Sequence, residues 1–316
     1  MTVAPGAVGV DVGGTKILAV RLDGAGALAG ETRRPTPADG AAALAGIIAA
    51  VEEVSAGAGG PTSLGVGIPA LVDARGGARF SPHLPGLVGV DVVGTLNRRW
   101  PGVPVWVGND ATAAGWAEQR RGAATGVADV LMVTIGTGIG GGIVTGGRLA
   151  EGAHRYAGEF GHMVVDPHGP RCPCGKQGCW ERYASGTGLG NAGREAALAG
   201  EADRVTALAG GDPEAVRGEH VTVAAREGDA QALAIMARFA WWLALGLANL
   251  ANAFDPEMIV IGGGLVDAGD VLLAPTRRAF ATLVEAGPQR GEVAIVAAAL
   301  GSSAGALGAA LLAQRG

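Results

Sequence analysis

Short apolar runs and glycine turns open this chain. An apolar strand pattern, VGVDV, is followed by the turn GGTK and by a second strand pattern, ILAVRLD. Two such runs joined by a short glycine turn are typical of a β-hairpin. The pattern returns in VLMVTIGTGIGGGIV, where two β-rich arms flank a polar glycine loop. The sequence therefore predicts two glycine hairpins and indicates two related halves.

Helix-period segments alternate with further strand patterns after the first hairpin. We expect a helix over about residues 39–56, then the strand SLGVGIP, a loop ending in FSPHLPGL, the strand VPVWVGND and the helix ATAAGWAEQRRG. The C-terminal half is mostly helical: the periodic segment 230–254 is followed by the strand MIVIGGGLV and a last helix over about 303–314. Residues 199–218, polar and rich in glycine, predict a surface excursion. The alternation predicts an α/β fold, with a domain boundary near residues 108–115.

Composition narrows the class of protein. The 316 residues suffice for two domains or one large one, and 48% hydrophobic residues support an extensive core. A net charge of −5 without a basic block argues against a nucleic-acid partner. The longest apolar stretch, residues 239–254, contains asparagines and is short of a membrane span, and no signal peptide pattern opens the chain. We therefore expect a cytoplasmic protein without a membrane partner.

The cysteines cluster in one short segment, RCPCGKQGCW, as Cys172, Cys174 and Cys179. Three thiolates need a fourth ligand to complete the tetrahedron that a structural zinc ion prefers. His162, in GEFGH just upstream, is the best-placed fourth ligand, with His154 and His168 in reserve. Three unrelated buried thiols are the alternative, but the tight grouping favours zinc.

The glycine turns carry groups that suit phosphate. The first turn presents a carboxylate, two glycines, a hydroxyl and an ammonium: Asp11, Gly13, Gly14, Thr15 and Lys16. Backbone N–H groups and the ammonium can bind phosphate oxygens, and the carboxylate can hold hydrated Mg²⁺. Residues 136–142 offer a second backbone cradle, and residues 262–264 form a third bare loop. Neither the GxxxxGK[ST] loop nor the GxGxxG fingerprint fits these turns.

Five segments, in order, resemble the nucleotide-binding segments of the actin, sugar kinase and Hsp70 superfamily: VGVDVGGTKILAVRLD, VPVWVGNDATAAGWAE, VLMVTIGTGIGGGIV, MIVIGGGLV and SSAGALGAAL. The stretch GEFGHMVVDPHGPRCPCGKQGCWERYASG resembles the signature of the ROK family (repressors, open reading frames, kinases). Nearly the whole chain is similar to the bacterial glucokinases of that family. ROK repressors carry an additional N-terminal helix-turn-helix, which we do not expect here because the hairpin begins by Val8.

The resemblance implies two ribonuclease-H-like domains of the actin and hexokinase type, with sugar and ATP meeting in the cleft between them. The smaller domain would comprise residues 1–112 and 301–316, and the larger one residues 113–300 with the zinc site. The implied activity is ATP- and Mg²⁺-dependent phosphorylation of the primary hydroxyl of a hexose, glucose before others. The implied assembly is a homodimer or homotetramer.

The resemblance also assigns roles to residues. Asp110, after Asn109 at the end of an apolar strand, matches the catalytic base that takes the proton of the acceptor hydroxyl. The sugar-binding positions are Gly67, His83, Asn109, Asp110, Glu159, His162 and Glu181. The positions for ATP are Asp11, Gly13, Gly14, Thr15, Lys16, Thr137, Gly138, Gly262, Gly263 and Gly264. If one ring nitrogen of His162 binds zinc, the other is oriented toward a sugar hydroxyl.

Plainer structural roles compete with these assignments. The alternative for Asp110 is an N-cap of the helix that begins at Ala111. Glu159 and Glu181 have the alternative of being surface carboxylates, although they flank the cysteine cluster. Trp241 and Trp242 look like a sugar-stacking platform, but aromatic residues in a long amphipathic helix more often belong to a core or a subunit interface.

One position departs from the family pattern. In SPHLPGL, His83 stands where glucokinases of the family commonly have asparagine, and a tryptophan expected a few residues on is missing. An imidazole cannot offer the same donor and acceptor as a carboxamide. Mannose, fructose, an N-acetylhexosamine or a C7-cyclitol therefore remains an alternative acceptor. Polyphosphate remains an alternative donor, and a non-catalytic sugar-sensing protein is the alternative from a different class.

Overall fold

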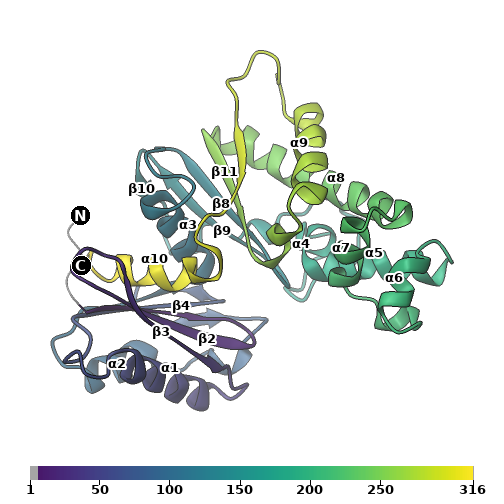
Figure 1. Cartoon of the computed structure of the whole chain (residues 1–316). Helices are drawn as coiled ribbons and strands as arrows, with labels where there is room; N and C mark the ends of the chain where they lie inside the picture. The colour runs from purple at the N-terminus through teal and green to yellow at the C-terminus, as the bar shows by residue number, and fades with distance from the viewer. Residues whose placement is uncertain (1–5, 316) are drawn as a thin grey trace. The chain divides into compact units, whose positions relative to one another are not determined.

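The computed structural model describes residues 6–315 (Figure 1). It divides into two compact α/β units. Among these residues, unit 1 comprises 6–128, 142–158 and 299–315, and unit 2 comprises 129–141 and 159–298. This division differs from the expected boundary after residue 112, because the helix that begins at Asp110 stays with unit 1.

Unit 1 contains a five-stranded sheet in the order β3-β2-β1-β4-β7. Its strands are β1 (Ala7–Val12), β2 (Lys16–Leu22), β3 (Leu28–Pro35), β4 (Ser63–Ile68) and β7 (Val105–Asn109). Its helices are α1 (Gly40–Val54), α2 (Val92–Arg99), α3 (Asp110–Arg121) and α10 (Ala304–Leu312). The small pair β5 (Leu71–Val72) and β6 (Ala78–Phe80) and the turn η1 (Pro85–Leu87) lie between β4 and α2 in the chain. β1 pairs in parallel with β4, and β4 with β7, whereas β1, β2 and β3 pair antiparallel.

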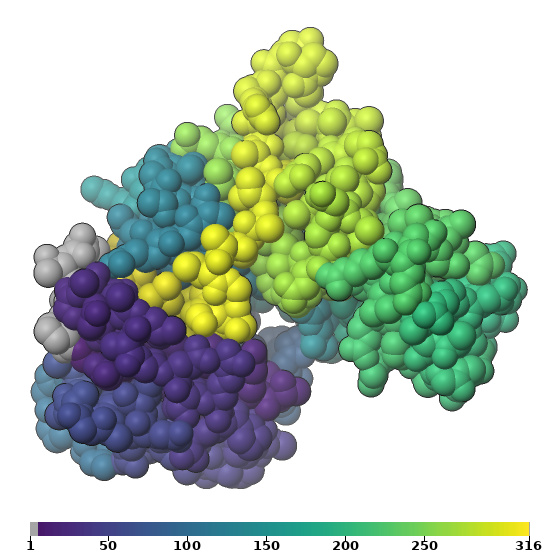
Figure 2. All heavy atoms as spheres, viewed as in Figure 1, coloured from purple at the N-terminus to yellow at the C-terminus, as the bar shows by residue number. Residues whose placement is uncertain are grey.

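The two faces of this sheet are built differently. Val8, Val10 and Val12 of β1 pack in one apolar cluster with Ile47 and Val51 of α1. Glycines alternate with these residues along β1 and β4, and the opposite face carries α10 (Figure 1). Figure 2 shows the yellow atoms of the C-terminal residues lying directly against the purple atoms of the first strands. The sequence pattern thus places bulky residues toward α1 and bare backbone toward α10.

Glycine allows α10 to approach the sheet closely. A Cβ atom on Gly65 would lie 1.8 Å from the carbonyl oxygen of Ala309, and one on Gly9 would lie 1.8 Å from that of Ala306. Gly308 of α10 meets α3 in the same way, because its Cβ would lie 1.8 Å from the carbonyl oxygen of Ala113. Helix and sheet are therefore in backbone contact, and no side chain fits between them.

Unit 2 is mostly helical. Its helices are α4 (Glu181–Ala184), α5 (Gly186–Leu198), α6 (Asp203–Leu208), α7 (Gly218–Arg226), α8 (Ala230–Phe254) and α9 (Asp270–Leu283), and its 3₁₀ turns are η2 (Phe160–His162), η3 (Pro213–Ala215) and η4 (Gly264–Ala268). A further turn, η5 (Gly301–Ser303), precedes α10 in unit 1. The second sheet has the order β10-β9-β8-β11-β12, and by the division above its strand β10 and the end of β9 belong to unit 1. Its strands are β8 (Val130–Ile135), β9 (Ile139–Thr145), β10 (Arg148–Leu149), β11 (Met258–Gly262) and β12 (Ala294–Ala297).

Most of the predicted elements are confirmed. Both glycine hairpins are present, as β1–β2 and β8–β9, and the helices expected at 39–56, 230–254 and 303–314 are α1, α8 and α10. The expected surface excursion at 199–218 was wrong in part, because it contains α6 and η3. Its apolar positions Ala202, Val205 and Val216 are fully buried, which fixes this segment on the unit.

Helix α8 is longer than the apolar stretch considered in the sequence. With 25 residues it is long and apolar enough to span a membrane by length and composition, and 56% of its most apolar window is buried inside the structure. Such burial is typical of a core helix. Trp242 stacks on Tyr183, with 4.1 Å between ring centroids, and Trp241 is 42% exposed.

We expect Gly65→Ala to destabilise the protein by about 3 kcal/mol, because the added methyl group would overlap the backbone of α10. Urea unfolding followed by circular dichroism measures this change. Gly291→Ala is the matched control, since Gly291 is exposed and its Cβ would meet nothing within 4 Å. Equal unfolding midpoints for the two variants would contradict the close packing of α10.

Candidate active site

The parallel strands of unit 1 bring polar residues to one edge of the sheet. Asp11 of β1 is paired with Gly67 of β4, and Ile68 of β4 is paired with Asn109, the last residue of β7. In parallel strands the carboxyl ends meet at the same edge, where open α/β sheets place their ligands. Asp110 follows Asn109 directly and begins α3. Asp11, Asn109 and Asp110 therefore lie at the same edge of the sheet.

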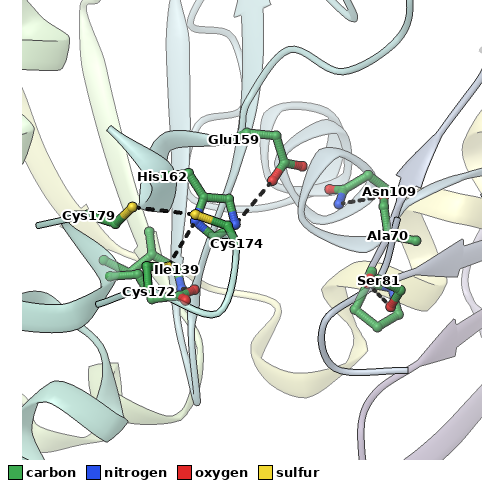
Figure 3. A network of polar contacts seen from close by, with 11 residues as sticks. Ala70, Ser81, Asn109, Ile139, Glu159, His162, Cys172, Cys174 and Cys179 are labelled. Carbon is green, nitrogen blue, oxygen red and sulfur yellow. Dashed lines mark hydrogen bonds and ion pairs between the residues drawn. The ribbon is translucent and has the colours of Figure 1, made fainter. Parts of the chain in front are cut away.

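Asn109 caps α3, so the alternative role of Asp110 as N-cap was wrong. The side-chain oxygen of Asn109 accepts a hydrogen bond of 2.9 Å from the N–H of Thr112. Its amide nitrogen donates to the carbonyl oxygen of Ala70 at 3.5 Å (Figure 3). One carboxylate oxygen of Asp110 accepts from the N–H of Ala111 at 2.8 Å. The cap fixes the backbone and leaves Asp110 at the start of the helix.

Burial makes the charge on these carboxylates unfavourable. It raises the pKa of Asp11 to about 7, the negative charge of Asp110 adds to this effect, and Lys16 opposes it. Burial likewise raises the pKa of Asp110, against the N–H of Ala111 and the positive charge of His83. Gly67 gives Asp110 room, because a Cβ there would lie 3.2 Å from the Cα of Asp110. Two carboxyls with raised pKa values at one edge indicate a functional site.

The loop that holds His83 is tied to the same edge. The hydroxyl of Ser81 donates to the carbonyl oxygen of Pro69 at 2.7 Å and accepts from the N–H of Leu84 at 3.1 Å (Figure 3). His83 is exposed, and its charge acts on Asp110. The structure therefore brings His83 into electrostatic reach of Asp110, within the same unit.

Hydrogen bonds from Thr36 fix the backbone of the first glycine turn. The hydroxyl of Thr36 donates to the carbonyl oxygen of Gly13 at 2.8 Å, and its N–H donates to that of Thr15 at 3.1 Å. Gly14, Thr15 and Lys16 remain exposed. The turn therefore presents its backbone, a hydroxyl and an ammonium to solvent beside Asp11, as a phosphate cradle requires.

The second glycine turn lies in unit 2 against the start of α5. The N–H of Gly186 donates to the carbonyl oxygen of Gly136 at 2.7 Å, and the hydroxyl of Thr187 donates to that of Thr137 at 2.8 Å. Gly263 has a φ of 85°, and its Cβ would lie 2.4 Å from the carbonyl oxygen of Ile135. Glycine is therefore required where the loop after β11 passes the end of β8.

A cavity of about 660 Å³ opens beside these two loops, entirely within unit 2. Gly136, Thr137 and Gly264 line it together with residues that the sequence did not single out: Gly186, Thr187, Gly190, Arg194, Arg217, Gly218, Glu219, Thr222, Val223, Arg226, Leu265, Asp267 and Ala268. Gly138, Gly262 and Gly263, which were predicted for the same site, are not among its lining residues. Gly262 faces the core, where its Cβ would lie 2.4 Å from Met132.

The cavity residues on α5 and α7 carry no motif that sequence reasoning could recognise. Arg194 is fixed by a hydrogen bond of 2.7 Å to the carbonyl oxygen of Val216 and by a contact with Asn191. The one available signal was the glycine spacing in SGTGLG, directly after the cysteine segment. The cavity combines apolar walls with three arginines, a lining that suits a planar base with phosphates.

The three cysteines and His162 come together in the structure, as their spacing predicted. The ligand atoms of His162, Cys172, Cys174 and Cys179 all lie within 4.8 Å of one another. The sulfurs of Cys174 and Cys179 are 3.6 Å apart, and Nδ1 of His162 is 3.8 Å from the sulfur of Cys172 (Figure 3). Tetrahedral zinc with bonds of about 2.3 Å to sulfur separates its ligands by about 3.8 Å. Among the described residues, neither His154 nor His168 belongs to the cluster.

The thiols need a cation to ionise together. Burial and the neighbouring sulfurs raise the pKa of Cys179 to about 12. A bound metal ion would supply the missing positive charge. Nδ1 of His162 faces the sulfurs, while its Nε2 lies 4.0 Å from a carboxylate oxygen of Glu159. The imidazole thus links the cluster to Glu159.

The last cysteine is followed by residues that pack firmly. Trp180 is fully buried against α8, where a Cβ on Gly246 would lie 2.0 Å from its ring. Its indole N–H donates to the carbonyl oxygen of Trp242 at 2.8 Å.

Glu181 is buried and its carboxylate accepts from the N–H of Ile139 at 2.9 Å, so the alternative of a surface carboxylate was wrong for this residue. Glu159 is partly exposed. Glu159, His162 and Glu181 are thus positioned within unit 2.

Comparisons with known proteins agree with this geometry. Residues 7–316 match the model of the ROK family. The chain belongs to the ROK family. It is 38% identical to a glucokinase of Streptomyces coelicolor over 97% of each chain, and 34% identical to an N-acetylmannosamine kinase of Shigella boydii, over 96% of this chain and 97% of that one. A solved ROK glucokinase of Streptomyces griseus, in complex with glucose and AMPPNP, is 39% identical, with a TM-score of 0.89 over 98% of this chain and 99% of that one. The protein is thus a sugar kinase with the actin- and hexokinase-type α/β fold predicted from its sequence.

We expect Asp110→Asn to raise the thermal midpoint at pH 8 and to change it less at pH 4. The folded-state pKa of both Asp110 and Asp11 lies above the ordinary value of 3.8, so their ionisation destabilises the fold as the pH rises from about 4 through 7. The Asp110→Asn variant removes one of the two negative charges. It therefore gains stability only at pH values where both carboxyls of the wild-type protein are ionised. Calorimetry at the two pH values, in chelator and without nucleotide, measures the difference. A variant that is equally destabilised at both would contradict it.

Proposed function

We propose that this ROK protein is an ATP- and Mg²⁺-dependent glucokinase that phosphorylates the 6-hydroxyl of glucose. The observation that carries the proposal is Asp110, a carboxyl with a raised pKa at the carboxyl edge of the unit 1 sheet. The glucokinases to which the chain is similar support the choice of sugar.

Asp110 serves as the base for the acceptor hydroxyl. A base works best when its pKa approaches the working pH, and burial moves the pKa of Asp110 in that direction. The reaction therefore needs Asp110 ionised and slows as the pH falls through its pKa. The proton of the 6-hydroxyl passes to the carboxylate as the oxygen attacks the γ-phosphorus and ADP leaves.

The phosphates are held by both glycine turns. The nucleoside occupies the cavity of unit 2, where Thr137 and Gly264 lie at its edge with Arg194 and Arg217. Gly138, Gly262 and Gly263 belong to the same loops but do not line the cavity, so we give them a role in the backbone shape of the loops. Gly13, Gly14, Thr15 and Lys16 bind the transferred phosphate. Asp11 holds hydrated Mg²⁺, which neutralises charge on the phosphates when bound.

The sugar is bound by groups that accept and donate in fixed directions. These are Asn109 and His83 in unit 1 and Glu159, His162 and Glu181 in unit 2, with Gly67 leaving space beside Asp110. Buried polar groups that lose their partner cost about 1–3 kcal/mol each, so this set discriminates among hydroxyl patterns.

We assign the cysteine cluster a structural zinc ion bound by His162, Cys172, Cys174 and Cys179. The separations of 3.6 Å between the sulfurs of Cys174 and Cys179 and of 3.8 Å between Nδ1 of His162 and the sulfur of Cys172 match the ligand spacing of tetrahedral zinc. Zinc on Nδ1 leaves Nε2 of His162 as the nitrogen that meets Glu159 and a sugar hydroxyl. Reduced thiols of this kind fit the cytoplasm, where ATP is also available.

Two observations favour a second acceptor. The imidazole of His83 acts on Asp110 from a tied loop, and the N-acetylmannosamine kinases show that relatives of this chain use an amide-bearing sugar. We therefore keep an N-acetylhexosamine as the second candidate and homodimer or homotetramer as the assembly.

Asp110→Asn is expected to lower kcat at least about 100-fold while changing glucose affinity less than about tenfold, because an amide keeps the shape but cannot take the proton. ADP release with Mg-ATP and glucose measures turnover, and calorimetry measures affinity. Wild-type turnover must be present for the comparison. Near-normal kcat in the variant would remove Asp110 from the role of base.

Cys174→Ser is expected to lose the zinc that the purified wild-type protein carries and to raise the KM for the sugar, since the cluster holds His162 and precedes Glu181. Metal analysis by mass spectrometry and steady-state kinetics are the measurements. His168→Ala, in the same segment but outside the cluster, is the control that retains both. Full zinc content in Cys174→Ser would refute the ligand assignment.

A further inference from the structure

A second cavity, of about 740 Å³, lies within unit 2. Residues of α4, α5, η3 and α8 line it, together with Pro170 of the cysteine segment. Apart from Arg194, none of its lining residues belongs to the sites proposed for nucleotide, sugar and zinc. A cavity of this size is typical of a site for a small molecule.

The aromatic wall of this second cavity is fixed in place. Tyr183 and Trp242, which both line it, are stacked with 4.1 Å between ring centroids and 22° between ring planes. The hydroxyl of Tyr183 donates to the carboxylate of Asp166 at 2.8 Å, and the carbonyl oxygen of Trp242 accepts from the indole of the buried Trp180. A preformed aromatic wall binds a ring with little loss of side-chain freedom.

Arg182 gives the second cavity an unpaired donor. This residue lines the cavity and is half-buried, and its Nε–H group is buried without a hydrogen-bond partner. Arg238 of α8 lines the same cavity and is exposed. A buried donor without an acceptor is unfavourable, and a guanidinium group pairs best with a phosphate or carboxylate. The two arginines therefore favour an anionic ligand.

Carboxylates limit the kind of anion that fits. Glu195 of α5 and Glu201 shortly after it line the same cavity. An ionised carboxylate accepts hydrogen bonds from hydroxyl groups and repels an anion that has none to offer. The ligand therefore needs an anionic group for the arginines, hydroxyl groups for the glutamates and a ring for the aromatic wall. A phosphorylated sugar carries all three.

The second cavity shares a wall with the first one, which Gly136 and Thr137 line. Arg194 of α5 lines both cavities. Its guanidinium donates to the carbonyl oxygen of Val216 at 2.7 Å and contacts the side-chain oxygen of Asn191, which lines the second cavity. A ligand that binds at Asn191 therefore acts on the group that holds Arg194 beside the first cavity.

We propose that the second cavity binds a sugar phosphate, the chemical class of the product of a sugar kinase, and that its occupation weakens nucleotide binding through Arg194. One guanidinium group cannot pair fully with an anion in both cavities, so the coupling between them is negative. The coupling rests on the proposed function, because it takes the first cavity as the nucleotide site. Binding in the second cavity does not depend on that assignment.

Calorimetry with glucose 6-phosphate tests the site itself. An excess of glucose is present throughout, so that the acceptor site holds the unphosphorylated sugar. We expect glucose 6-phosphate to bind, and Arg182→Gln to weaken this binding about tenfold or more, because the amide cannot pair with the phosphate. Arg238→Gln, on the exposed face of α8, is expected to act in the same direction without disturbing the fold. Arg278→Gln, exposed on α9 and not among the lining residues, is the control that binds like the wild type.

Inorganic phosphate is the second probe, and it is expected to bind at least about tenfold more weakly than glucose 6-phosphate, because it has no sugar ring or sugar hydroxyls to contact the wall. Three results would overturn the site: no binding of glucose 6-phosphate in the presence of glucose, equal affinity for inorganic phosphate, or unchanged affinity in both Arg182→Gln and Arg238→Gln.

The dissociation constant of AMPPNP tests the coupling. With glucose in excess, saturating glucose 6-phosphate is expected to raise it about fivefold in the wild type and to leave it unchanged in Arg182→Gln. By reciprocity, AMPPNP must weaken glucose 6-phosphate by the same factor. An AMPPNP affinity that ignores bound glucose 6-phosphate would overturn the coupling. A protein that binds no AMPPNP would refute the proposed function instead, and the binding of glucose 6-phosphate would still support the site.

Discussion

The parallel pairing of β1, β4 and β7 is the constraint on which the rest of the site depends. It brings Asp11 and Asp110 to one edge of the sheet, where Gly67 leaves room for Asp110 and Gly305 of α10 leaves room for the carboxylate of Asp11. The same sheet must accept α10 in backbone contact, which Gly9 and Gly65 permit. A pair of partly buried carboxylates is costly to ionise, and the close packing of α10 stabilises the unit that carries it.

Helix α3 connects the edge of the sheet that carries Asp11 and Asp110 to the segment that precedes α10. Its first residue is Asp110, which is set in place by the cap at Asn109, and its last turn carries Glu118, whose carboxylate accepts from three backbone N–H groups. In unit 2 the cysteine cluster plays a comparable part. It orients His162, and Trp180 locks the following residue, Glu181, against α8. Each unit thus holds its functional side chains on rigid elements, as precise positioning requires.

Much of this arrangement could be predicted from the sequence, because the signals were local. Hairpin turns, the helix at 230–254 and the place of His162 beside the three cysteines followed from spacing. Asn109 as the cap of α3 could not be separated from Asp110 without coordinates, since both residue types cap helices. Arg194 and Arg217 line the cavity of unit 2 through the packing of α5 and α7, and Glu118 meets Ala299 far along the chain. Such contacts are tertiary, and no periodicity records them.

The most direct test of this account compares kcat/KM for glucose and N-acetylmannosamine with Mg-ATP and identifies the product of the better acceptor by ³¹P and ¹³C NMR. We expect glucose to be preferred and the phosphorus to couple to carbon 6. Phosphorylation at another position, preference for the amide-bearing sugar, or no transfer to either would contradict it.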